Sequence, residues 1–155
     1  AVNNITSGTG DSTFSPDQIC TRAQAVTFLY RLMKGSAEAA DTFNDVTADK
    51  YYAAAVAWAV ENGITNGISA AAFGPDLTVT RAQMVSFLYR AAGSPDVFGE
   101  NPFSDVTEAD YYNDAVLWAV QNNITTGTSD EAFSPNDLCT RAQVVTFMYR
   151  YTNLS

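Results

Sequence analysis

The feature that constrains this chain most is a motif that occurs three times at nearly constant spacing. Its three versions read CTRAQAVTFLYR, VTRAQMVSFLYR and CTRAQVVTFMYR, with their threonines at Thr21, Thr80 and Thr140. These threonines are 59 and 60 residues apart. A repeat of this length is typical of supersecondary units that stack on one another to bury a shared core. The sequence therefore predicts a repeat protein.

Two units are complete and one is partial. The complete units cover residues 41–95 and 101–155, whereas residues 1–36 match only from the equivalent of Ala59 onward. Each complete unit predicts two helices, of which the second runs from the arginine of the motif to its closing Tyr-Arg. A loop that ends in Phe-x-Pro joins them, since proline keeps the residue before it extended. These elements predict an all-α chain of tandem helix-loop-helix repeats.

The first helix of each complete unit is expected over residues 51–62 and 111–122. The segment YYAAAVAWAV has no charged side chain, which is typical of a helix buried on most sides. Trp58 and Trp118 occupy the same position in these helices. A tryptophan there belongs either to the core or to the edge of a pocket, and the sequence leaves both interpretations open.

The composition of the chain narrows its possible partners. With 155 residues, of which 46% are hydrophobic and 16% charged, the chain should be globular. Its net charge of −9 argues against binding to nucleic acid or to an anionic membrane surface. The longest apolar run, AAAVAWAV, is far too short to cross a membrane. We therefore expect neither a nucleic-acid partner nor membrane insertion.

The chain contains no histidine, which removes much catalytic and metal-binding chemistry. Ser-His-Asp and Cys-His nucleophilic sites need that residue, and so do most zinc sites. The sequence also has no Gly-rich phosphate loop and no calcium-binding loop. We expect no catalytic residue, no metal and no cofactor.

Most of the repeated motif has a structural explanation. A threonine followed three residues later by glutamine is a capping box at a helix N-terminus. The arginine between them is unexplained, because the first turn of a helix already carries a partial positive charge. These arginines, beside unpaired backbone N–H groups, would form an anion site, at Arg22, Arg81 and Arg141. Alternatively they pair with acids of a neighbouring unit, such as Asp45 or Asp105, and both interpretations remain open.

The cysteines and the start of the chain say little about the cellular compartment. Cys20 and Cys139 occupy the position of Val79, which favours a role as small apolar side chains. A disulfide between them would require these corners of two units to meet within about 7 Å. Residues 1–10 lack a secretion signal, which indicates either a cytosolic chain or a mature or trimmed fragment.

Taken together, these motifs resemble the S-layer homology (SLH) family over nearly the whole length of the chain. The resemblance rests on Phe-x-Asp-Val at 43–46 and 103–106, the Trp-containing helix, the segments NITSG, GITNG and NITTG, the Phe-x-Pro turn, and TRAQ in place of the usual TRAE. Their fixed order makes the match specific. It implies a three-pronged, all-α module in which three repeats pack around a pseudo-threefold axis.

The resemblance also implies a function. Such modules are non-catalytic and extracellular, and they anchor bacterial proteins to a Gram-positive-type cell wall by binding an acidic, pyruvylated cell-wall polysaccharide in grooves between repeats. Carried over by motif position, the expected ligand-binding residues are Arg22, Arg81, Arg141, Thr21, Thr80, Thr140, Trp58, Trp118, Gly8, Gly67 and Gly127. The alternative is a protein-interaction or surface-layer assembly module that binds no glycan.

The first unit departs from the family pattern because it lacks the Trp-containing helix and the Phe-x-Asp-Val turn. If the Trp-containing helices form the central bundle, that bundle is one member short. We expect that trimming removed the segment or that a second polypeptide or copy supplies it.

Overall fold

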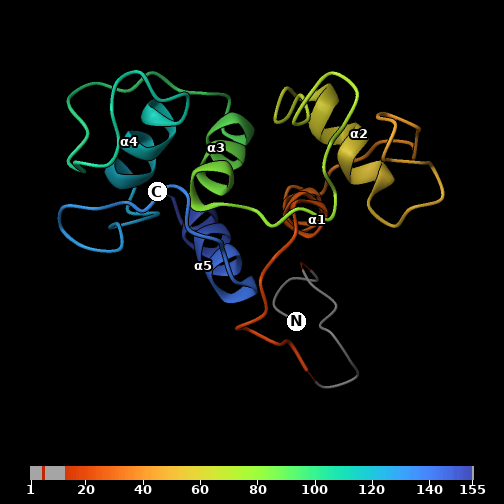
Figure 1. The fold of residues 1–155 in the computed structure, drawn as a ribbon, viewed down its shortest axis with the longest axis horizontal. Coiled ribbons are helices and arrows are strands. Elements are labelled where there is room, and N and C mark those ends of the chain that lie inside the picture. Colours follow the sequence, from red (N-terminus) through yellow and green to blue (C-terminus); the bar gives the residue numbers. More distant parts are fainter. Residues whose placement is uncertain (1–4, 6–12, 155) are drawn as a thin grey trace.

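The structure is a computed structural model, described here for residue 5 and residues 13–154. This part of the chain contains five helices, α1 (Arg22–Leu32), α2 (Ala53–Glu61), α3 (Arg81–Ala91), α4 (Asn113–Gln121) and α5 (Arg141–Thr152) (Figure 1). Extended pairing within it is limited to isolated bridges. The predicted all-α class is confirmed. None of the helices in these residues has both the length and the apolar character needed to cross a membrane.

The three motif helices, α1, α3 and α5, begin in the same way. The side chains of Thr21, Thr80 and Thr140 each accept a hydrogen bond from the backbone N–H of the glutamine three residues later. That glutamine side chain accepts a bond from the threonine N–H in return. Two backbone donors at each helix start are thereby satisfied. The predicted capping boxes are confirmed.

The Trp-containing helices α2 and α4 are shorter than predicted. Each begins after a pair of tyrosines, and neither Tyr52 nor Tyr112 caps its helix with a side-chain hydrogen bond. The C-terminal ends lie within one residue of the expected ends. Gly63 and Asn123, which follow these helices, have φ values of 67° and 57°. Both residue types tolerate this left-handed conformation, which ends a helix.

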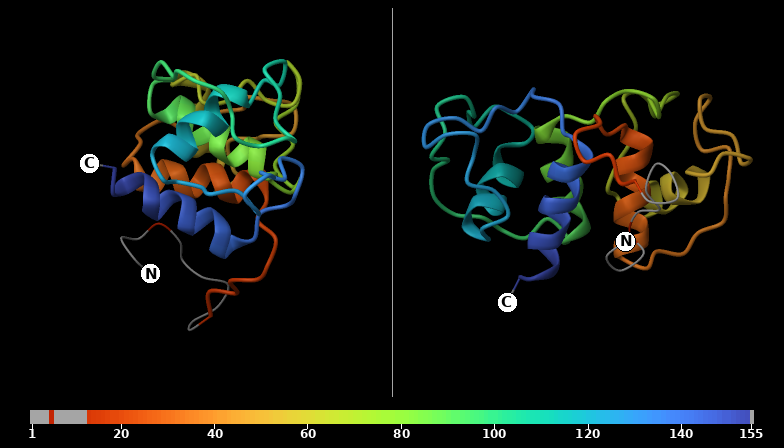
Figure 2. Two further views of the ribbon diagram at one scale, coloured as in Figure 1. Left: turned by 90° about the vertical axis from the view of Figure 1, so that its left-hand side faces the viewer. Right: turned by 90° about the horizontal axis from the view of Figure 1, so that it is seen from below.

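The motif helices form the centre of the molecule. Helices α1, α3 and α5 contact one another pairwise, whereas α2 contacts α1 and α4 contacts α3 (Figure 2). Each Trp-containing helix therefore packs on the motif helix of the preceding unit. The hypothesis that the Trp-containing helices form the central bundle is wrong. The described chain has a complete central bundle and two outer helices.

A ring of backbone hydrogen bonds joins the three units at the centre. The N–H of Cys20 donates to the carbonyl of Cys139 at 2.9 Å, that of Cys139 to Val79 at 3.0 Å, and that of Val79 to Cys20 at 2.9 Å. The ring closes after three steps, as expected for a pseudo-threefold axis. All three side chains are fully buried, and both cysteines are free thiols. The corners of the units do meet, and the cysteines serve there as small apolar side chains.

Both tryptophans lie in the core between helices. The ring of Trp58 packs edge-on against Tyr30, with centroids 5.7 Å apart. Trp118 contacts Tyr89 at 5.7 Å and Tyr151 at 6.1 Å. Because Tyr30 and Tyr89 belong to α1 and α3, these aromatic contacts fasten each Trp-containing helix to the centre.

Candidate functional site: a pocket between units

The N-terminus of each motif helix is closed by a loop of a neighbouring unit. At the start of α1, the N–H groups of Arg22 and Ala23 donate to the carbonyls of Leu77 and Pro75 at 2.8 and 3.0 Å. The first N–H groups of α3 and α5 are bound in the same way by loops of the third and first units. The expectation of unpaired N–H groups beside the arginines is therefore wrong. The arginine side chains have to supply the positive charge by themselves.

The guanidinium group of Arg81 lies between two phenylalanine rings. Its Cζ atom is 4.8 Å from the ring centroid of Phe133 and 5.4 Å from that of Phe147. Its Nε donates to the carbonyl oxygen of Phe133 at 2.8 Å. A cation over an aromatic face is attracted by the ring, more strongly when both are shielded from water. Arg81 is only 5% exposed, so its orientation is fixed before any ligand arrives.

The other two motif arginines are held in equivalent positions. Each donates from Nε to the carbonyl of a Phe-x-Pro turn, at 2.9 Å for Arg22 and 3.0 Å for Arg141. Each also lies between two rings, Phe73 and Phe87 for Arg22, and Phe14 and Phe28 for Arg141. All three arginines thus bind a turn from another unit.

The acids that the sequence offered as partners are engaged elsewhere. The carboxylate of Asp45 accepts two hydrogen bonds, both 2.8 Å long, from backbone N–H groups of the Phe-x-Pro turn in its own unit. Asp105 makes the equivalent pair in the last unit. Within the described residues, neither Arg22 nor Arg81 forms an ion pair. The ion-pair interpretation therefore does not hold for these two arginines.

Burial also acts on the protonation of these side chains. It lowers the pKa of both Arg22 and Arg81, and nearby acidic groups partly oppose this effect. An arginine pKa begins above about 12, so both guanidinium groups stay charged at neutral pH.

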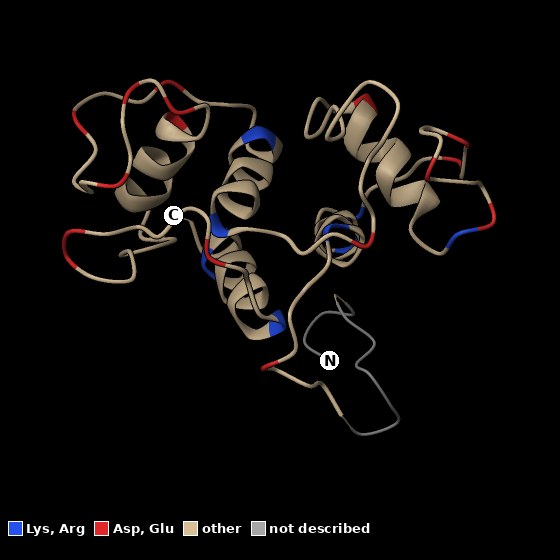
Figure 3. Cartoon of the chain, in the orientation of Figure 1, with Lys and Arg blue, Asp and Glu red and all other residues tan. Residues whose placement is uncertain are grey.

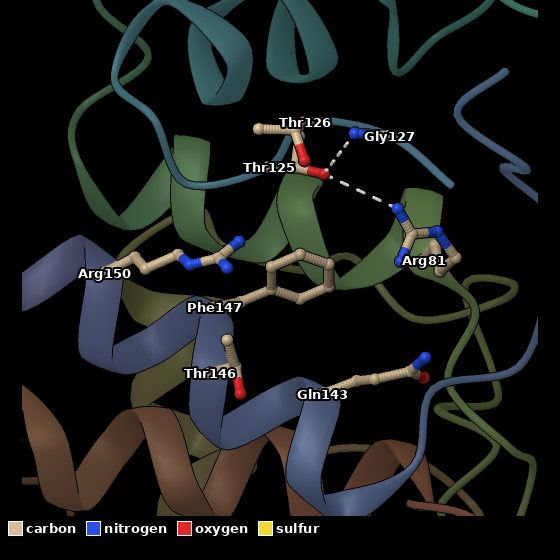
Figure 4. Close-up of a pocket in the computed structure, with 8 residues that line it drawn as sticks. All are labelled: Arg81, Thr125, Thr126, Gly127, Gln143, Thr146, Phe147 and Arg150. Carbon is tan, nitrogen blue, oxygen red and sulfur yellow. Dashed lines mark hydrogen bonds between the residues drawn. The ribbon is translucent and has the colours of Figure 1, made fainter. Parts of the chain in front are cut away.

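A pocket of about 190 Å³ lies where the second and third units meet (Figure 4). It is lined by Arg81, Thr125, Thr126, Gly127, Gln143, Thr146, Phe147 and Arg150. These residues include two guanidinium groups and no carboxylate. Figure 3 shows acidic residues spread over the outer loops, with most basic residues on α1, α3 and α5. The pocket is therefore positively charged in a chain whose net charge is −9.

The two arginines of the pocket come from neighbouring units and face its interior from different sides (Figure 4). Nη2 of Arg81 donates to Oγ1 of Thr125 at 3.5 Å, and that oxygen also accepts the N–H of Gly127 at 3.1 Å. Nη1 of Arg150 donates to the carbonyl of Ile124 at 3.0 Å. A guanidinium group has five N–H donors, so both arginines keep donors for a ligand.

The structure brings part of the expected ligand-binding set to this pocket. Arg81 and Gly127 line it, but Thr80 and Thr140 do not, and their hydroxyl oxygens are used in the capping boxes. Trp118 lies among tyrosine rings and is not part of the lining. Of these five residues, only Arg81 and Gly127 are placed to touch a ligand in this pocket.

The remaining members of the set belong to the equivalent positions of other units. Arg22, Arg141 and Thr21 repeat the geometry of their counterparts, and Trp58 is packed on Tyr30 like the second tryptophan on α3.

The expected glycines have a structural role as well. Gly67 and Gly127 have φ values of 82° and 84°, a region that side-chain-bearing residues avoid. A Cβ atom at these positions would lie 2.7 Å from the ring of Phe43 and 2.5 Å from that of Phe103. Packing within the unit therefore already requires glycine at both sites. Gly8 lies outside the described residues.

Several residues of the pocket were missed by the sequence analysis. Arg150 closes a motif helix, and a cation is favourable at a helix C-terminus, so its place in the sequence needs no ligand to explain it. Gln143, Phe147 and Arg150 follow one another at intervals of four and three residues, so they share one face of α5. This spacing recurs in all three motifs and was the signal available in the sequence.

Comparison with known protein families identifies the family of this chain. The S-layer homology domain matches residues 3–26, 42–85 and 102–145, more than half of the chain. The chain belongs to the S-layer homology (SLH) domain family. The three matched segments follow the three units and include both the complete and the partial ones.

Similar proteins place this SLH chain among surface proteins. It is 33% identical over 105 residues to the "Surface-layer 125 kDa protein" of Lysinibacillus sphaericus, and 34% identical over 100 residues to a "Cell surface protein" of Thermoanaerobacter kivui. These alignments cover 68% and 61% of this chain but 9% and 13% of the relatives. The expected localisation at the cell surface is confirmed.

A third similar protein carries an enzyme name. The chain is 29% identical over 109 residues, 70% of its length, to an "Amylopullulanase" of Thermoanaerobacterium thermosulfurigenes. The alignment covers 6% of that enzyme. The chain thus spans only a small part of each of these three relatives.

Proposed function

We propose that this SLH chain is a non-catalytic module that anchors a cell-surface protein by binding an acidic, pyruvylated cell-wall polysaccharide in the pockets between its units. The observation that carries the proposal is the pocket in which Arg81 and Arg150, from neighbouring units, face the same space without a carboxylate beside them. Two cations in one small pocket repel each other unless an anion binds between or beside them.

The proposed ligand group is the carboxylate of the pyruvyl substituent. Arg81 is held by two rings and a carbonyl, so little side-chain freedom is lost when the carboxylate binds. Hydrogen bonds between guanidinium and carboxylate groups are stronger than those between neutral groups. The hydroxyl group of Thr126 and the side-chain amide N–H groups of Gln143, whose Oε1 is used in the capping box, are available to bind sugar hydroxyls. A neutral sugar would leave the charged donors of the pocket without partners, which disfavours its binding.

The test measures binding of purified wall polysaccharide, with and without its pyruvyl groups, by titration calorimetry. The informative variant replaces the three closing arginines, Arg31, Arg90 and Arg150, by glutamine, since they occupy equivalent positions in the three units. A double variant, Lys34→Gln with Lys50→Gln, removes positive charge away from the pocket described above and serves as the control.

We expect the triple arginine variant to bind the pyruvylated polymer at least tenfold more weakly, with the lysine variant unchanged. Charge-assisted contacts of this kind contribute about 1.5–3 kcal/mol each. The single variant Arg81→Lys keeps the charge but removes the planar fork, so it should also weaken binding. Wild-type affinity in all arginine variants would refute the proposal.

The alternative function, a protein-interaction or surface-layer assembly module, gives a different result in the same experiment. It predicts that removing the pyruvyl groups changes nothing.

A further inference from the structure

One face of α5 is uncovered in the described part of the chain. The face consists of Ala142, Val145, Thr146 and Tyr149, spaced so that they lie on one side of the helix. Ala142 and Val145 are half-buried, Thr146 is exposed, and Tyr149 is 63% exposed. We call these four residues the α5 face.

The equivalent faces of the other two motif helices are covered. On α1, exposure is at most 4% for Ala23, Val26 and Thr27, and on α3 it is at most 3% for Ala82, Val85 and Ser86. The difference follows from the outer helices, because α2 contacts α1 and α4 contacts α3. Within the described residues, no such helix packs along α5. The aromatic contact between Trp118 of α4 and Tyr151 lies at the last turn of α5, outside the α5 face.

The α5 face has the same residue types as the α1 face that binds α2. Both faces read alanine, valine, threonine and tyrosine at the same four helical positions. On α1 the tyrosine of the set, Tyr30, contacts the indole ring of Trp58 at 5.7 Å. Tyr149 occupies this position on α5, and no aromatic ring of the described residues contacts it. The α5 face therefore carries the same set of side chains that packs against a Trp-containing helix on α1.

The two helices that cover such faces share a sequence pattern. Both α2 and α4 contain Ala-Val-x-Trp-Ala-Val, beginning at Ala55 and Ala115. The alanines allow close approach of the backbones, and the tryptophan contacts the tyrosine of the motif helix. A third helix with this pattern has the shape and chemistry to cover the α5 face.

We propose that the α5 face is a docking site for a helix that carries the Ala-Val-x-Trp-Ala-Val pattern and has no partner of its own. The α2 and α4 helices of a second copy do not meet the last condition, because they already cover α1 and α3. Among its described residues, the uncovered helix face that a second copy offers is its own α5 face, and α5 lacks the Ala-Val-x-Trp-Ala-Val pattern. The occupant is therefore a separate segment with a free helix of the α2 and α4 type.

Docking at the α5 face affects the neighbouring pocket. Thr146 belongs to the α5 face and also lines the pocket that contains Arg81 and Arg150. A bound helix would therefore form an additional wall at the edge of that pocket. The docking itself involves no glycan, so its test is independent of the proposed function.

The test uses a fluorescent peptide with the sequence of residues 103–121, which contains the α4 pattern, and the full 155-residue chain. Fluorescence anisotropy measures binding, and a thermal melt measures stabilisation by the peptide. We expect saturable binding and a rise in Tm. A peptide with Trp118→Asp serves as the control and should bind at least tenfold more weakly.

Two protein variants address the face itself. Val145→Asp places a charge at its centre, and Tyr149→Asp removes the ring expected to meet the tryptophan of the peptide. Tyr149 is largely exposed, so this second variant should keep its fold. Each should weaken peptide binding at least tenfold. Phe98→Asp, at an exposed apolar residue of the linker before α4, is the matched control and should bind as the wild type does.

Three results would overturn the proposal. The first is the absence of peptide binding to the wild-type chain. The second is undiminished binding to both the Val145→Asp and the Tyr149→Asp variants, which would place the peptide elsewhere. The third is a dimer of the chain that forms without peptide, in sedimentation experiments, and is lost in the Tyr149→Asp variant. That result would identify a second copy as the occupant.

Discussion

Helices α3 and α5 share the TRAQ start and the same capping box, yet they are buried to different extents. Four equivalent residues that face the centre are buried in both helices, and they are Arg81, Met84, Phe87 and Leu88 in α3. Three further residues are buried only in α3, and they are those beneath α4. The cap and the central contacts thus belong to the motif, whereas the remaining burial depends on an outer helix.

This difference distinguishes the central bundle from the outer layer of helices. The central bundle, with its ring of hydrogen bonds, is formed equally by all three units. The outer layer is added to individual motif helices and can be present on one and absent from another. The following predictions compare the two helices and begin with the largest expected difference.

The largest difference is expected between Val85→Asp and Val145→Asp. Val85 is fully buried beneath α4, so a carboxylate there would be buried without a partner. This change should lower the free energy of unfolding by roughly 3–5 kcal/mol. The same change at half-buried Val145 should cost less than about 1 kcal/mol. Urea unfolding followed by circular dichroism measures both values, and equal losses would mean that α5 is covered in solution.

Removing the helix cap should destabilise the protein equally at α3 and at α5. Thr80 and Thr140 each accept a hydrogen bond of 3.2 Å from the backbone of the N3 glutamine. Substitution of either threonine by alanine should cost about 1 kcal/mol. Serine at the same positions is the matched control, because it keeps the hydroxyl group. A much smaller loss for Thr140→Ala would show that the start of α5 is not held as firmly as that of α3.

A third comparison concerns the residues before the caps, where α5 has Cys139 and α3 has Val79. Burial raises the pKa of the Cys139 thiol from 9.0 to about 12. Between these pH values the unfolded chain has lost a proton that the folded chain retains. The free energy of unfolding should therefore fall as the pH rises through this range.

Cys20 behaves in the same way, since burial also raises its pKa to about 12. The double variant Cys20→Val with Cys139→Val should therefore show a weaker loss of stability between pH 8 and pH 10.5 than the wild type. Urea unfolding at a series of pH values gives both slopes. Identical slopes would indicate that the thiols are accessible to ionisation in the folded chain.

The sequence predicted well what depends on neighbouring positions in the chain. The capping boxes require only a threonine and a glutamine three residues apart, and the ends of α2 and α4 require a residue that tolerates positive φ. The unusual place of an arginine in the first turn pointed to Arg81, whereas the family resemblance supplied the pseudo-threefold arrangement and Gly127.

The sequence did not show which unit each element packs on. Arg81 and Phe133 are 52 residues apart, and Arg141 and Phe14 are 127 residues apart, so nothing local indicates that they meet. For the same reason, the sequence did not show that each Trp-containing helix packs on the motif helix of the preceding unit. Arg150 was missed for another reason, because a favourable position at a helix end already accounted for it.

The closed ring of Cys20, Val79 and Cys139 gives this repeat protein a property that a linear array lacks. In a linear array the terminal repeats have one neighbour each and can fray independently. In a ring every unit has two neighbours, because the first and last are bonded to each other. Loss of any one unit opens the circle and weakens both others. Because the units are bonded in a closed ring, all three would resist a force applied to one end of the chain and would unfold together in a single step.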